Sequence, residues 1–291
     1  MGPVPQGEGF VGRIGRGLSR RVRQALAALL LVLGAALVFL VWFGDTAERY
    51  TSGKRPEQFY AELDGDLLDD FGGVFGIAHN SGDDLGATRQ ALRHGADVIE
   101  IDVVTYDDRL FAAHDSPLRF LGKRFFRGPS LEEVWKEAAT AEVVKLDLKE
   151  SGAGYLDLVV AFVNEHRDGD IEIVAASART DVLERLRDDA PHVIRLLSVS
   201  SASGVERLRT DRRLRGLIDG VTIREDRLHG RAAEWLEREG LLVVAWVVNE
   251  APRLNELVRA GVDGITTDNL AIMTLLGAQE RHERRLSDRS R

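Results

Sequence analysis

The 291-residue chain contains no cysteine. Disulfide bonds, thiol nucleophiles and zinc sites with thiolate ligands are therefore excluded, while either side of a membrane remains open as its location. An excess of basic residues is also missing, because 39 Lys and Arg residues stand against 47 Asp and Glu residues and give a formal net charge of −8. Nucleic-acid binding depends on a phosphate-neutralising basic surface, so we expect no nucleic-acid partner.

One long run without charge is present, and it covers residues 25–43 with the sequence ALAALLLVLGAALVFLVWF. At about 1.5 Å per residue, a helix of this length nearly spans a bilayer core of about 30 Å. The basic residues of the segment 1–24 precede it, and they are Arg13, Arg16, Arg20, Arg21 and Arg23. Because positive charge stays on the cytoplasmic side, we predict a single-pass protein of the cell membrane with a cytoplasmic N-terminus and an extracytoplasmic catalytic domain.

Residues 25–43 have two other interpretations. A cleaved signal peptide would have a shorter apolar core followed by an A-x-A site, and no clear site of this kind follows. A buried core helix is the third interpretation. Downstream, residues 44–73 are polar and acidic and are predicted to form a juxtamembrane linker, and the charged residues 279–291 are predicted to form a disordered tail.

Residues 74–278 alternate short apolar runs with amphipathic stretches. Eight such runs begin at Val74, Asp97, Ala141, Ile171, His192, Ile218, Leu241 and Val262. Several amphipathic stretches stop at a glycine, as at Gly95, Gly240 and Gly261, which is typical of a left-handed helix cap. Near-continuous apolar strands that alternate with helices indicate a parallel sheet, and eight units in about 200 residues predict an α/β fold of the (β/α)8 TIM-barrel type. An open doubly wound sheet is the alternative, but no G-x-G-x-x-G follows the first strand.

The carboxyl ends of barrel strands carry the functional residues of this fold. His79 ends the first predicted strand, Glu100 and Asp102 lie two apart on the second, and Asp147 and Lys149 lie two apart on the third. Side chains at i and i+2 of a strand point the same way, so these carboxylates are predicted to converge. Carboxylate oxygens are hard ligands, which favours a divalent cation, Mg²⁺ or Ca²⁺.

Each of these residues also has a structural interpretation. A single histidine at a strand end is often structural, and the aromatic ring of Trp246 suits barrel packing as well as a substrate wall. Glu100 and Asp102 flank an isoleucine in a strand that is expected to be buried on both faces, where unpaired charge is costly. A buried salt bridge would satisfy them, but a bound cation is the interpretation we favour.

In this order, the motifs resemble those of the glycerophosphodiester phosphodiesterase family over roughly residues 74–276. The matching segments are GADVIEIDVVTYDD from Gly95, AHD around His114, SLEEVW from Ser130, KLDLK from Lys145, AWVVN from Ala245 and GVDGITTD from Gly261. The resemblance implies a PLC-like phosphodiesterase on a TIM barrel, which acts in lipid metabolism on a small-molecule or lipid phosphodiester.

The resemblance also implies a role for each matched residue. His79 and His114 are implied as the catalytic acid–base pair, and Glu100, Asp102 and Asp147 as ligands of the divalent cation. Lys149 is implied at the phosphate, and Trp246 at the glycerol or substrate wall. In some relatives the attacking oxygen is a neighbouring hydroxyl of the substrate, which first gives a cyclic phosphate.

The chain departs from the family pattern at two places. The family has an arginine after the first histidine, whereas this chain has Asn80, whose amide lacks the charge for a bidentate phosphate contact. The Pro-Glu-Asn-Thr segment of the family is also missing. A His-Asn pair at this position is similar to the sphingomyelinase D-like phospholipases, so Asn80 is expected at the substrate, and both glycerophosphodiesters and lysophospholipid-type molecules are candidate substrates.

Two further functional hypotheses remain. A catalytically impaired barrel that binds phosphorylated ligands at the cell envelope would explain Asn80. Another metal-using TIM-barrel enzyme, such as a proton-abstracting lyase, fits the carboxylates and Lys149 loosely, but it fits the paired histidines and the closing TTD motif poorly. The sequence leaves the oligomeric state open.

Overall fold

The computed structural model describes residues 24, 29–34, 59–61, 63, 65, 67, 68, 70, 71, 73–114, 128–229 and 232–278. The chain divides into two compact units, residues 1–51 and residues 52–291. In the first unit, residues 29–34 are helical and their side chains are exposed. Most of the predicted span 25–43 lies outside the described residues, and none of the helices in the described part is both long enough and apolar enough to cross a bilayer. The membrane anchor therefore stays a prediction.

The second unit is built on a closed barrel of eight parallel strands. In barrel order they are β1 (Phe75–Ala78), β2 (Val98–Tyr106), β4 (Val143–Leu148), β5 (Glu172–Ser177), β6 (Ile194–Val199), β7 (Gly220–Arg224), β8 (Leu242–Trp246) and β9 (Gly264–Thr267). Pairing of β1 with both β2 and β9 closes the ring. Each of the eight predicted apolar runs forms one strand, so the predicted (β/α)8 fold is confirmed.

One additional strand leaves the ring. β3 (Arg109–Ala112) pairs antiparallel with the end of β2, so that Tyr106 lies opposite Arg109. The turn between them uses Asp107 and Asp108, both with positive φ, a backbone region that aspartate tolerates better than most residues. We call the end of the barrel at the carboxyl ends of the strands its C-terminal mouth. The hairpin extends beyond this mouth, and His114, which follows β3, lies there.

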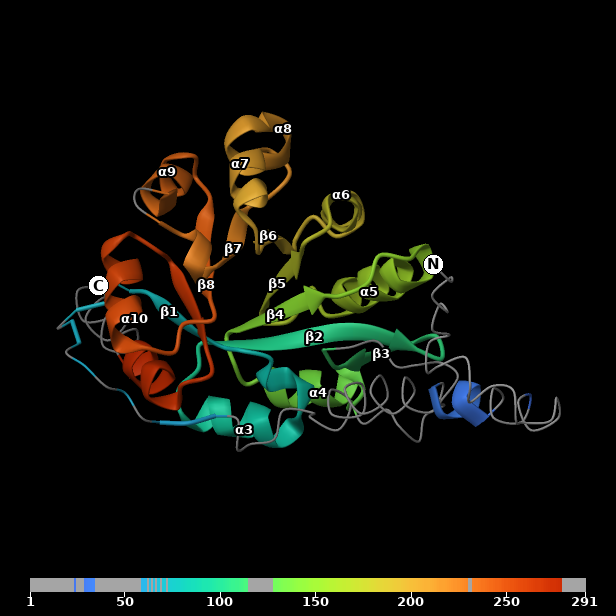
Figure 1. The fold of residues 1–291 in the computed structure, drawn as a ribbon. Helices are drawn as coiled ribbons and strands as arrows, with labels where there is room; N and C mark the ends of the chain where they lie inside the picture. Colours follow the sequence, from blue (N-terminus) through green and yellow to red (C-terminus); the bar gives the residue numbers. More distant parts are fainter. Residues whose placement is uncertain are drawn as a thin grey trace, which may run out of the picture. The chain divides into compact units, whose positions relative to one another are not determined.

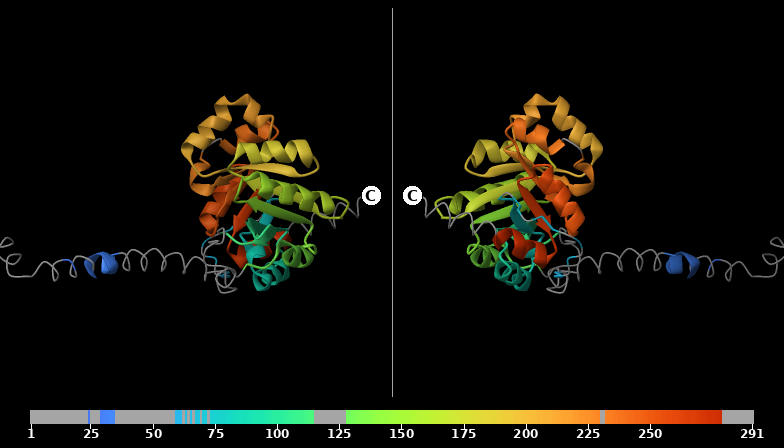
Figure 2. Two further views of the ribbon diagram at one scale, coloured as in Figure 1. Left: turned by 90° about the vertical axis from the view of Figure 1, so that its right-hand side faces the viewer. Right: turned by 90° about the vertical axis from the view of Figure 1, so that its left-hand side faces the viewer.

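The helices form a layer outside the strands (Figure 1), and Figure 2 shows this layer from two opposite sides. They are α3 (Leu85–Arg93), α4 (Leu131–Ala138), α5 (Ala153–Glu165), α6 (Thr180–Asp189), α7 (Ala202–Thr210), α8 (Arg212–Arg215), α9 (Ala232–Arg238) and α10 (Ala251–Arg259), together with the 3-10 turns η2 (Ser81–Asp83) and η5 (Glu225–Arg227) and a last helix over residues 270–278. Gly95, Gly240 and Gly261 follow α3, α9 and α10 with φ between 76° and 83°, as their predicted role in left-handed caps requires.

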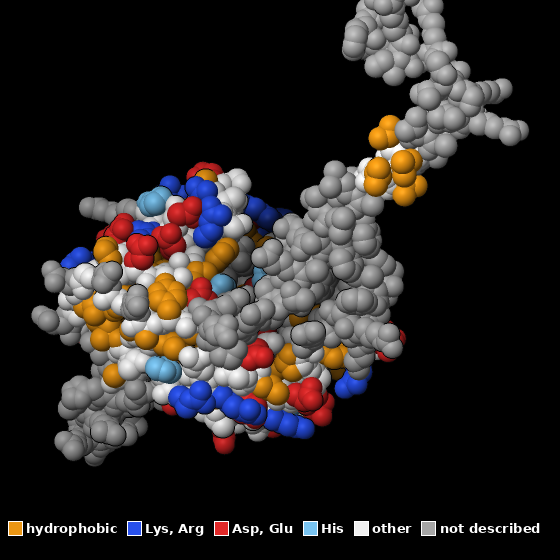
Figure 3. Space-filling view, turned by 60° about the horizontal axis from the view of Figure 1, so that its bottom comes forward, with side chains coloured by type: hydrophobic (Ala, Val, Ile, Leu, Met, Phe, Trp, Pro, Cys, Tyr) orange, Lys and Arg blue, Asp and Glu red, His pale blue; other side chains and the backbone are white. Residues whose placement is uncertain are grey.

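Local sequence signals account for the helix ends near the site. Ser130 and Glu133 form a capping box at the start of α4, because the hydroxyl of Ser130 accepts from the Glu133 N–H and the Glu133 carboxylate accepts from the Ser130 N–H. On the outer surface, Arg89 of α3 bonds Glu137 of α4 through two nitrogens. The surface over α3 and α4 accordingly carries both signs of charge (Figure 3).

The period-two pattern of the strands separates two layers of core. Ile99, Ile101 and Val103 of β2 point outward into the apolar layer between strands and helices. Val98 points inward and packs in the lumen with apolar residues of the other strands, which are Ile77, Ala176, Leu196 and Val244. The lumen is therefore apolar near the beginnings of the strands, which we call the N-terminal mouth, and becomes polar towards their ends.

Part of the predicted linker 44–73 packs on the barrel. The backbone carbonyl of Tyr60 accepts from the Leu270 N–H at 2.7 Å, and Tyr60 forms an isolated bridge with Asn269. Phe59 and Phe71 are buried in the apolar layers outside the strands. Phe59 and Phe71 therefore belong to the core of the barrel unit. Burial of their aromatic rings stabilises this packing through the hydrophobic effect, which a solvated linker would not provide.

Three aspartates repeat one arrangement at the N-terminal mouth. Asp97, Asp219 and Asp263 each precede a strand, and each carboxylate accepts the backbone N–H of a residue on the preceding barrel strand. The distance from the backbone nitrogen to the carboxylate oxygen is 2.7 Å for Gly76 and Asp97, 2.8 Å for Arg195 and Asp219, and 2.7 Å for Val243 and Asp263. Each carboxylate thereby satisfies an amide at the strand start, where the regular ladder has not yet begun.

Replacing one of these carboxylates should destabilise the fold. We expect Asp263→Ala to lower the free energy of unfolding by about 1–3 kcal/mol, because the N–H of the fully buried Val243 loses its acceptor. Urea unfolding of the full chain, followed by circular dichroism, measures this change. As a matched control, Asp168→Ala removes an aspartate whose side chain is 86% exposed and should stay within about 0.5 kcal/mol of the wild type. Equal effects of the two variants would contradict this role of Asp263.

Candidate active site

A cavity of about 310 Å³ opens at the C-terminal mouth of the barrel. Seven of the eight predicted site residues line it, which are His79, Asn80, Glu100, His114, Asp147, Lys149 and Trp246. The eighth, Asp102, lies in the wall immediately behind, within the same acidic cluster as Glu100 and Asp147. The structure therefore brings all eight together from β1, β2, β3, β4 and β8 and the turns that follow them.

The register between β2 and β4 creates the acidic cluster. Asp102 lies opposite Asp147, and Glu100 lies opposite Lys145. One carboxylate oxygen from each of Glu100, Asp102 and Asp147 comes within 4.8 Å of the others. Parallel strands present alternate residues to the same face, so a slip of one residue would turn these side chains out of the lumen.

The turn after β1 fixes Asp102 from behind. The carboxylate of Asp83 in η2 accepts the backbone N–H of Asp102 at 3.0 Å. This turn lies directly against β2, since a Cβ at Gly82 would come within 2.3 Å of Ile101 Cγ1. Only glycine allows such an approach, so Gly82 connects the segment after His79 to the strand that carries the carboxylates.

Lys145, which was not among the predicted site residues, compensates one of the three negative charges. Its Nζ donates to Glu100 Oε1 at 3.0 Å, and both side chains are almost completely buried. Burial opposes ionisation of Glu100, but the Lys145 ammonium outweighs it and holds the pKa of that carboxyl below its ordinary value. The salt-bridge interpretation is thus correct for one oxygen of Glu100, while Oε2 has no hydrogen-bond partner among the described residues.

Lys149 lies beside the other two carboxylates. Its Nζ is 2.5 Å from Asp147 Oδ2 and 3.2 Å from Asp102 Oδ1, although the second contact lacks hydrogen-bond geometry. Burial alone would lower the pKa of Lys149, but the carboxylates of Asp102 and Asp147 outweigh it and raise this pKa. The ammonium is therefore charged at every physiological pH, as a contact to a phosphate oxygen would require.

Asp102 is the least compensated member of the cluster. Burial raises its pKa to about 7, because the attraction of Lys149 only partly offsets desolvation and the repulsion of Asp147 and Glu100. Within the described part of the chain, neither of its buried oxygens has a hydrogen-bond partner. Buried carboxylate oxygens without partners are costly, so this cluster is suited to a hard divalent cation.

Binding of a divalent cation should depend on the protonation of Asp102. We expect Mg²⁺ or Ca²⁺ to raise the melting temperature more at about pH 8 than at about pH 6, because Asp102 must release its proton to act as a ligand. The pKa of Asp102 is higher in the folded chain than in the unfolded chain, so the folded chain holds this proton more tightly. The metal-free fold is therefore more stable at low pH, and this contribution is lost as the pH rises through 7. Scanning calorimetry with cation or chelator measures both effects.

The matched control for this measurement is Asp102→Asn, which keeps the size of the side chain and removes its titration. This variant should show a small shift on adding cation at both pH values. An equal cation-induced shift in wild type and Asp102→Asn would contradict a metal site at this cluster.

His79 is oriented by a chain of contacts from β9. Its Nδ1 lies 3.0 Å from Asp268 Oδ1, and Asn249 Oδ1 accepts the backbone N–H of Asp268 at 2.9 Å. A carboxylate only accepts hydrogen bonds, so Nδ1 carries the hydrogen and Nε2 carries the lone pair of the neutral ring. The arrangement prepares Nε2 to accept a proton. Asp268 follows β9 and Asn249 follows β8, and neither was predicted to orient His79.

The tautomer of His79 provides a test of this contact. In Asp268→Asn, the amide oxygen is expected to face Asn249, whose Nδ2 lies 3.4 Å from Asp268 Oδ2, and the amide NH₂ then faces His79. We predict that the hydrogen moves from Nδ1 to Nε2, which ¹⁵N NMR of the histidine ring measures directly. The control Asp168→Asn should leave the His79 signals unchanged, and an unchanged tautomer in Asp268→Asn would contradict the orienting role.

The remaining predicted residues lie around the cavity rim. His114 is exposed at the end of the hairpin, and residues 115–127 after it lie outside the described residues. Asn80 is 6% exposed and has φ 46°, in the left-handed region that asparagine tolerates. Trp246 lines the cavity, and its Nε1 is buried without a hydrogen-bond partner among the described residues.

Two more lining residues were missed from the sequence. Arg179 follows β5 and holds Asp181 through two nitrogens at 2.8 and 3.1 Å, with an exposed side chain. Thr222 of β7 is 2% exposed, and its hydroxyl has no partner in the described part of the chain. Lys145 lies two residues before Asp147 on the same strand, and this i+2 spacing was the signal that could have revealed it.

Comparison with solved structures identifies proteins with the same fold. A phosphodiesterase from Oleispira antarctica, in complex with the product sn-glycerol-3-phosphate, is 20% identical, aligns over 69% of this chain and 96% of its own, and has a TM-score of 0.58. A glycerophosphodiester phosphodiesterase from Parabacteroides distasonis is 19% identical over 76% of this chain and 99% of its own, with a TM-score of 0.54.

A third structure, a glycerophosphodiester phosphodiesterase from Agrobacterium tumefaciens, is 17% identical over 69% of this chain and 99% of its own, with a TM-score of 0.52. No family model and no curated protein matches the sequence. The chain therefore has the barrel fold of the glycerophosphodiester phosphodiesterases.

Proposed function

We propose that this chain is a metal-dependent phosphodiester hydrolase of the glycerophosphodiester phosphodiesterase family. Its substrates are glycerophosphodiesters or lysophospholipid-type molecules, from which it releases an alcohol and glycerol phosphate. The observation that carries the proposal is that His79 and His114 share one cavity with an acidic cluster whose buried oxygens lack hydrogen-bond partners among the described residues. The fold, shared with solved phosphodiesterases, supports the same reaction class.

Glu100, Asp102 and Asp147 are the proposed ligands of Mg²⁺ or Ca²⁺. When bound, the cation neutralises charge on the phosphate and orients it. Lys149, adjacent to two of these carboxylates, provides a fixed positive charge for a phosphate oxygen. The cation and Lys149 would together supply part of the positive charge that an arginine at position 80 provides in the family and that Asn80 lacks.

The two histidines are the proposed proton carriers. Nε2 of His79, oriented through Asp268, can take a proton from the attacking oxygen or give one to the leaving alcohol, and His114 performs the complementary transfer. As the new P–O bond forms, the P–O bond to the alcohol breaks, and the alcohol oxygen receives a proton. The attacking oxygen comes from water or from a neighbouring hydroxyl of the substrate.

Polar atoms on the cavity wall favour a substrate with hydroxyl groups. Thr222 and Trp246 both line the cavity, and the buried hydroxyl of the first and the buried Nε1–H of the second lack partners among the described residues. A buried donor without a partner is costly, and a glycerol hydroxyl would satisfy it. The Oleispira antarctica structure holds sn-glycerol-3-phosphate, a ligand of this class. Arg179 at the rim, which also pairs with Asp181, carries a positive charge that suits an anionic group of the substrate.

The location belongs to the same proposal. The predicted anchor over residues 25–43 would hold the barrel at the extracytoplasmic side of the cell membrane. Phosphodiesters derived from membrane lipids would be available to a site held there.

Metal-dependent turnover by the full chain, purified with a mild detergent, tests the proposal. Glycerophosphocholine, glycerophosphoethanolamine, glycerophosphoglycerol and lysophosphatidylcholine are offered with Mg²⁺, Ca²⁺ or chelator, and ³¹P NMR separates cyclic from open products. We expect cleavage of at least one substrate that stops with chelator. His79→Ala should lower turnover by about 10²–10⁴-fold, because it removes one proton carrier.

A binding barrel without catalysis is the competing outcome. It would show ligand-induced thermal stabilisation and no turnover in a folded protein that binds the cation. Turnover that persists in both His79→Ala and Asp102→Asn would contradict the assigned site. Asp168→Ala, on the exposed surface, is the matched control and should retain full activity.

A further inference from the structure

Two lysines of β4 and the turn after it each hold one oxygen of the acidic cluster. Lys145 Nζ donates to Glu100 Oε1 at 3.0 Å, and Lys149 Nζ donates to Asp147 Oδ2 at 2.5 Å. If a divalent cation bound to either of these oxygens, it would come into contact with an ammonium of the same sign, and the two charges would repel each other. Glu100 therefore keeps Oε2 for a cation, and Asp147 keeps Oδ1.

Asp102 offers its two oxygens unequally for the same reason. Its Oδ1 lies 3.2 Å from the Lys149 ammonium, whereas Oδ2 is the oxygen without such a contact among the described residues. The side chain is completely buried, and the Asp83 carboxylate holds the backbone N–H of Asp102 at 3.0 Å, so the residue is fixed from behind. Each of the three carboxylates thus presents one oxygen that no ammonium occupies.

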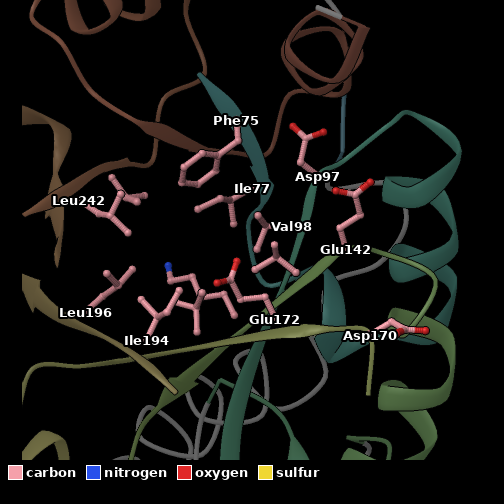
Figure 4. Close-up of a pocket in the computed structure, with 14 residues that line it drawn as sticks. Phe75, Ile77, Asp97, Val98, Glu142, Asp170, Glu172, Ile194, Leu196 and Leu242 are labelled. Atoms are coloured by element: carbon pink, nitrogen blue, oxygen red, sulfur yellow. The ribbon is translucent and has the colours of Figure 1, made fainter. Parts of the chain in front are cut away.

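The lumen beneath the cluster is apolar, so further protein ligands are not offered from that side by the described residues. Lys145 also lines a second cavity, of about 580 Å³, at the N-terminal mouth. Figure 4 shows the side chains of Ile77, Leu196 and Leu242 turned towards a common space there. The acidic residues of this second cavity lie at its rim, at the starts of β2, β4 and β5, and they are Asp97, Glu142, Asp170 and Glu172. The remaining ligands of a cation must therefore reach it from the C-terminal mouth.

This arrangement matches the coordination chemistry of Mg²⁺ better than that of Ca²⁺. Ca²⁺ takes about six to eight oxygen ligands and often uses both oxygens of a carboxylate. Mg²⁺ is smaller, requires an octahedral shell, and keeps several water molecules beside a few carboxylate oxygens and substrate phosphates. Three carboxylates against two ammoniums also leave a single negative charge in the cluster, which suits a partly hydrated ion more than a cage built entirely from protein.

We propose that Lys145 and Lys149 restrict the acidic cluster to single-oxygen contacts and thereby select Mg²⁺ over Ca²⁺. The inference rests on the proposed function, because it takes the cluster as the site of the cation. Lys145 then does more than balance the charge of Glu100, since it also removes the second oxygen that bidentate binding of Ca²⁺ would need. The ligand positions that the protein leaves open face the active-site cavity, where water or a phosphate oxygen can fill them.

Isothermal titration calorimetry of the full chain with MgCl₂ or CaCl₂ alone, at about pH 8, tests the proposal without any turnover. We expect the wild type to bind Mg²⁺ at least about threefold more tightly than Ca²⁺. Lys145→Met keeps the length of the side chain and releases Glu100 Oε1, so the ratio of the two affinities should move towards Ca²⁺ by at least about threefold. The matched control is Lys136→Met, an exposed lysine on α4, which should keep the wild-type ratio.

A second variant guards against a loss of folding in Lys145→Met, which leaves a buried carboxylate without its partner. Lys149→Met releases Asp147 Oδ2 at a position whose side chain is 23% exposed, and it should shift the ratio in the same direction. Circular dichroism verifies that each variant is folded.

The possible outcomes separate this inference from the proposed function. Equal or tighter binding of Ca²⁺ by the wild type would overturn the selection of Mg²⁺ and leave the cation site in place. An unchanged ratio in every folded lysine variant would overturn the role of the lysines. A folded wild type that binds neither ion would overturn both the inference and the proposed cation site.

Discussion

The register between β2 and β4 is the constraint on which the rest of the site depends. It places Asp102 against Asp147 and Glu100 against Lys145, so that three carboxylates and one lysine enter a lumen that is otherwise apolar below them. Bringing these charges out of water costs free energy that the apolar layers on both sides of the sheet must outweigh. The barrel thus stabilises a cluster that would repel itself in solution.

The unequal compensation of these charges gives the cluster its proposed chemistry. Lys145 neutralises Glu100 and Lys149 lies against Asp147, while burial raises the pKa of Asp102 to about 7. A divalent cation would provide the missing positive charge, and His79 lies above the cluster with its tautomer set by Asp268. The two ends of the lumen differ accordingly, since the C-terminal mouth is polar and the N-terminal mouth is apolar with an acidic rim.

Much of the fold could be predicted from sequence because the period of the apolar pattern changes with each element. All eight strands and the glycine caps followed from it, and strand-end counting located His79, the carboxylates and Lys149. Side chains that act through other residues were missed by counting strand ends alone. Lys145 lies inside β4, where only its i+2 spacing from Asp147 points to the lumen. Asp268 meets His79 only because β9 pairs with β1. Phe59 and Phe71 were missed because isolated apolar residues in a polar segment carry no periodicity.

The central claim is that the acidic cluster holds a divalent cation beside the phosphate of the substrate. Anomalous diffraction from crystals soaked with Mn²⁺ and sn-glycerol-3-phosphate tests it most directly, because Mn²⁺ occupies sites made for Mg²⁺ or Ca²⁺. We predict one strong peak between the carboxylates of Glu100, Asp102 and Asp147, with the phosphate between it and His79. A peak elsewhere, or none while Lys149 keeps both its carboxylate contacts, would contradict the account.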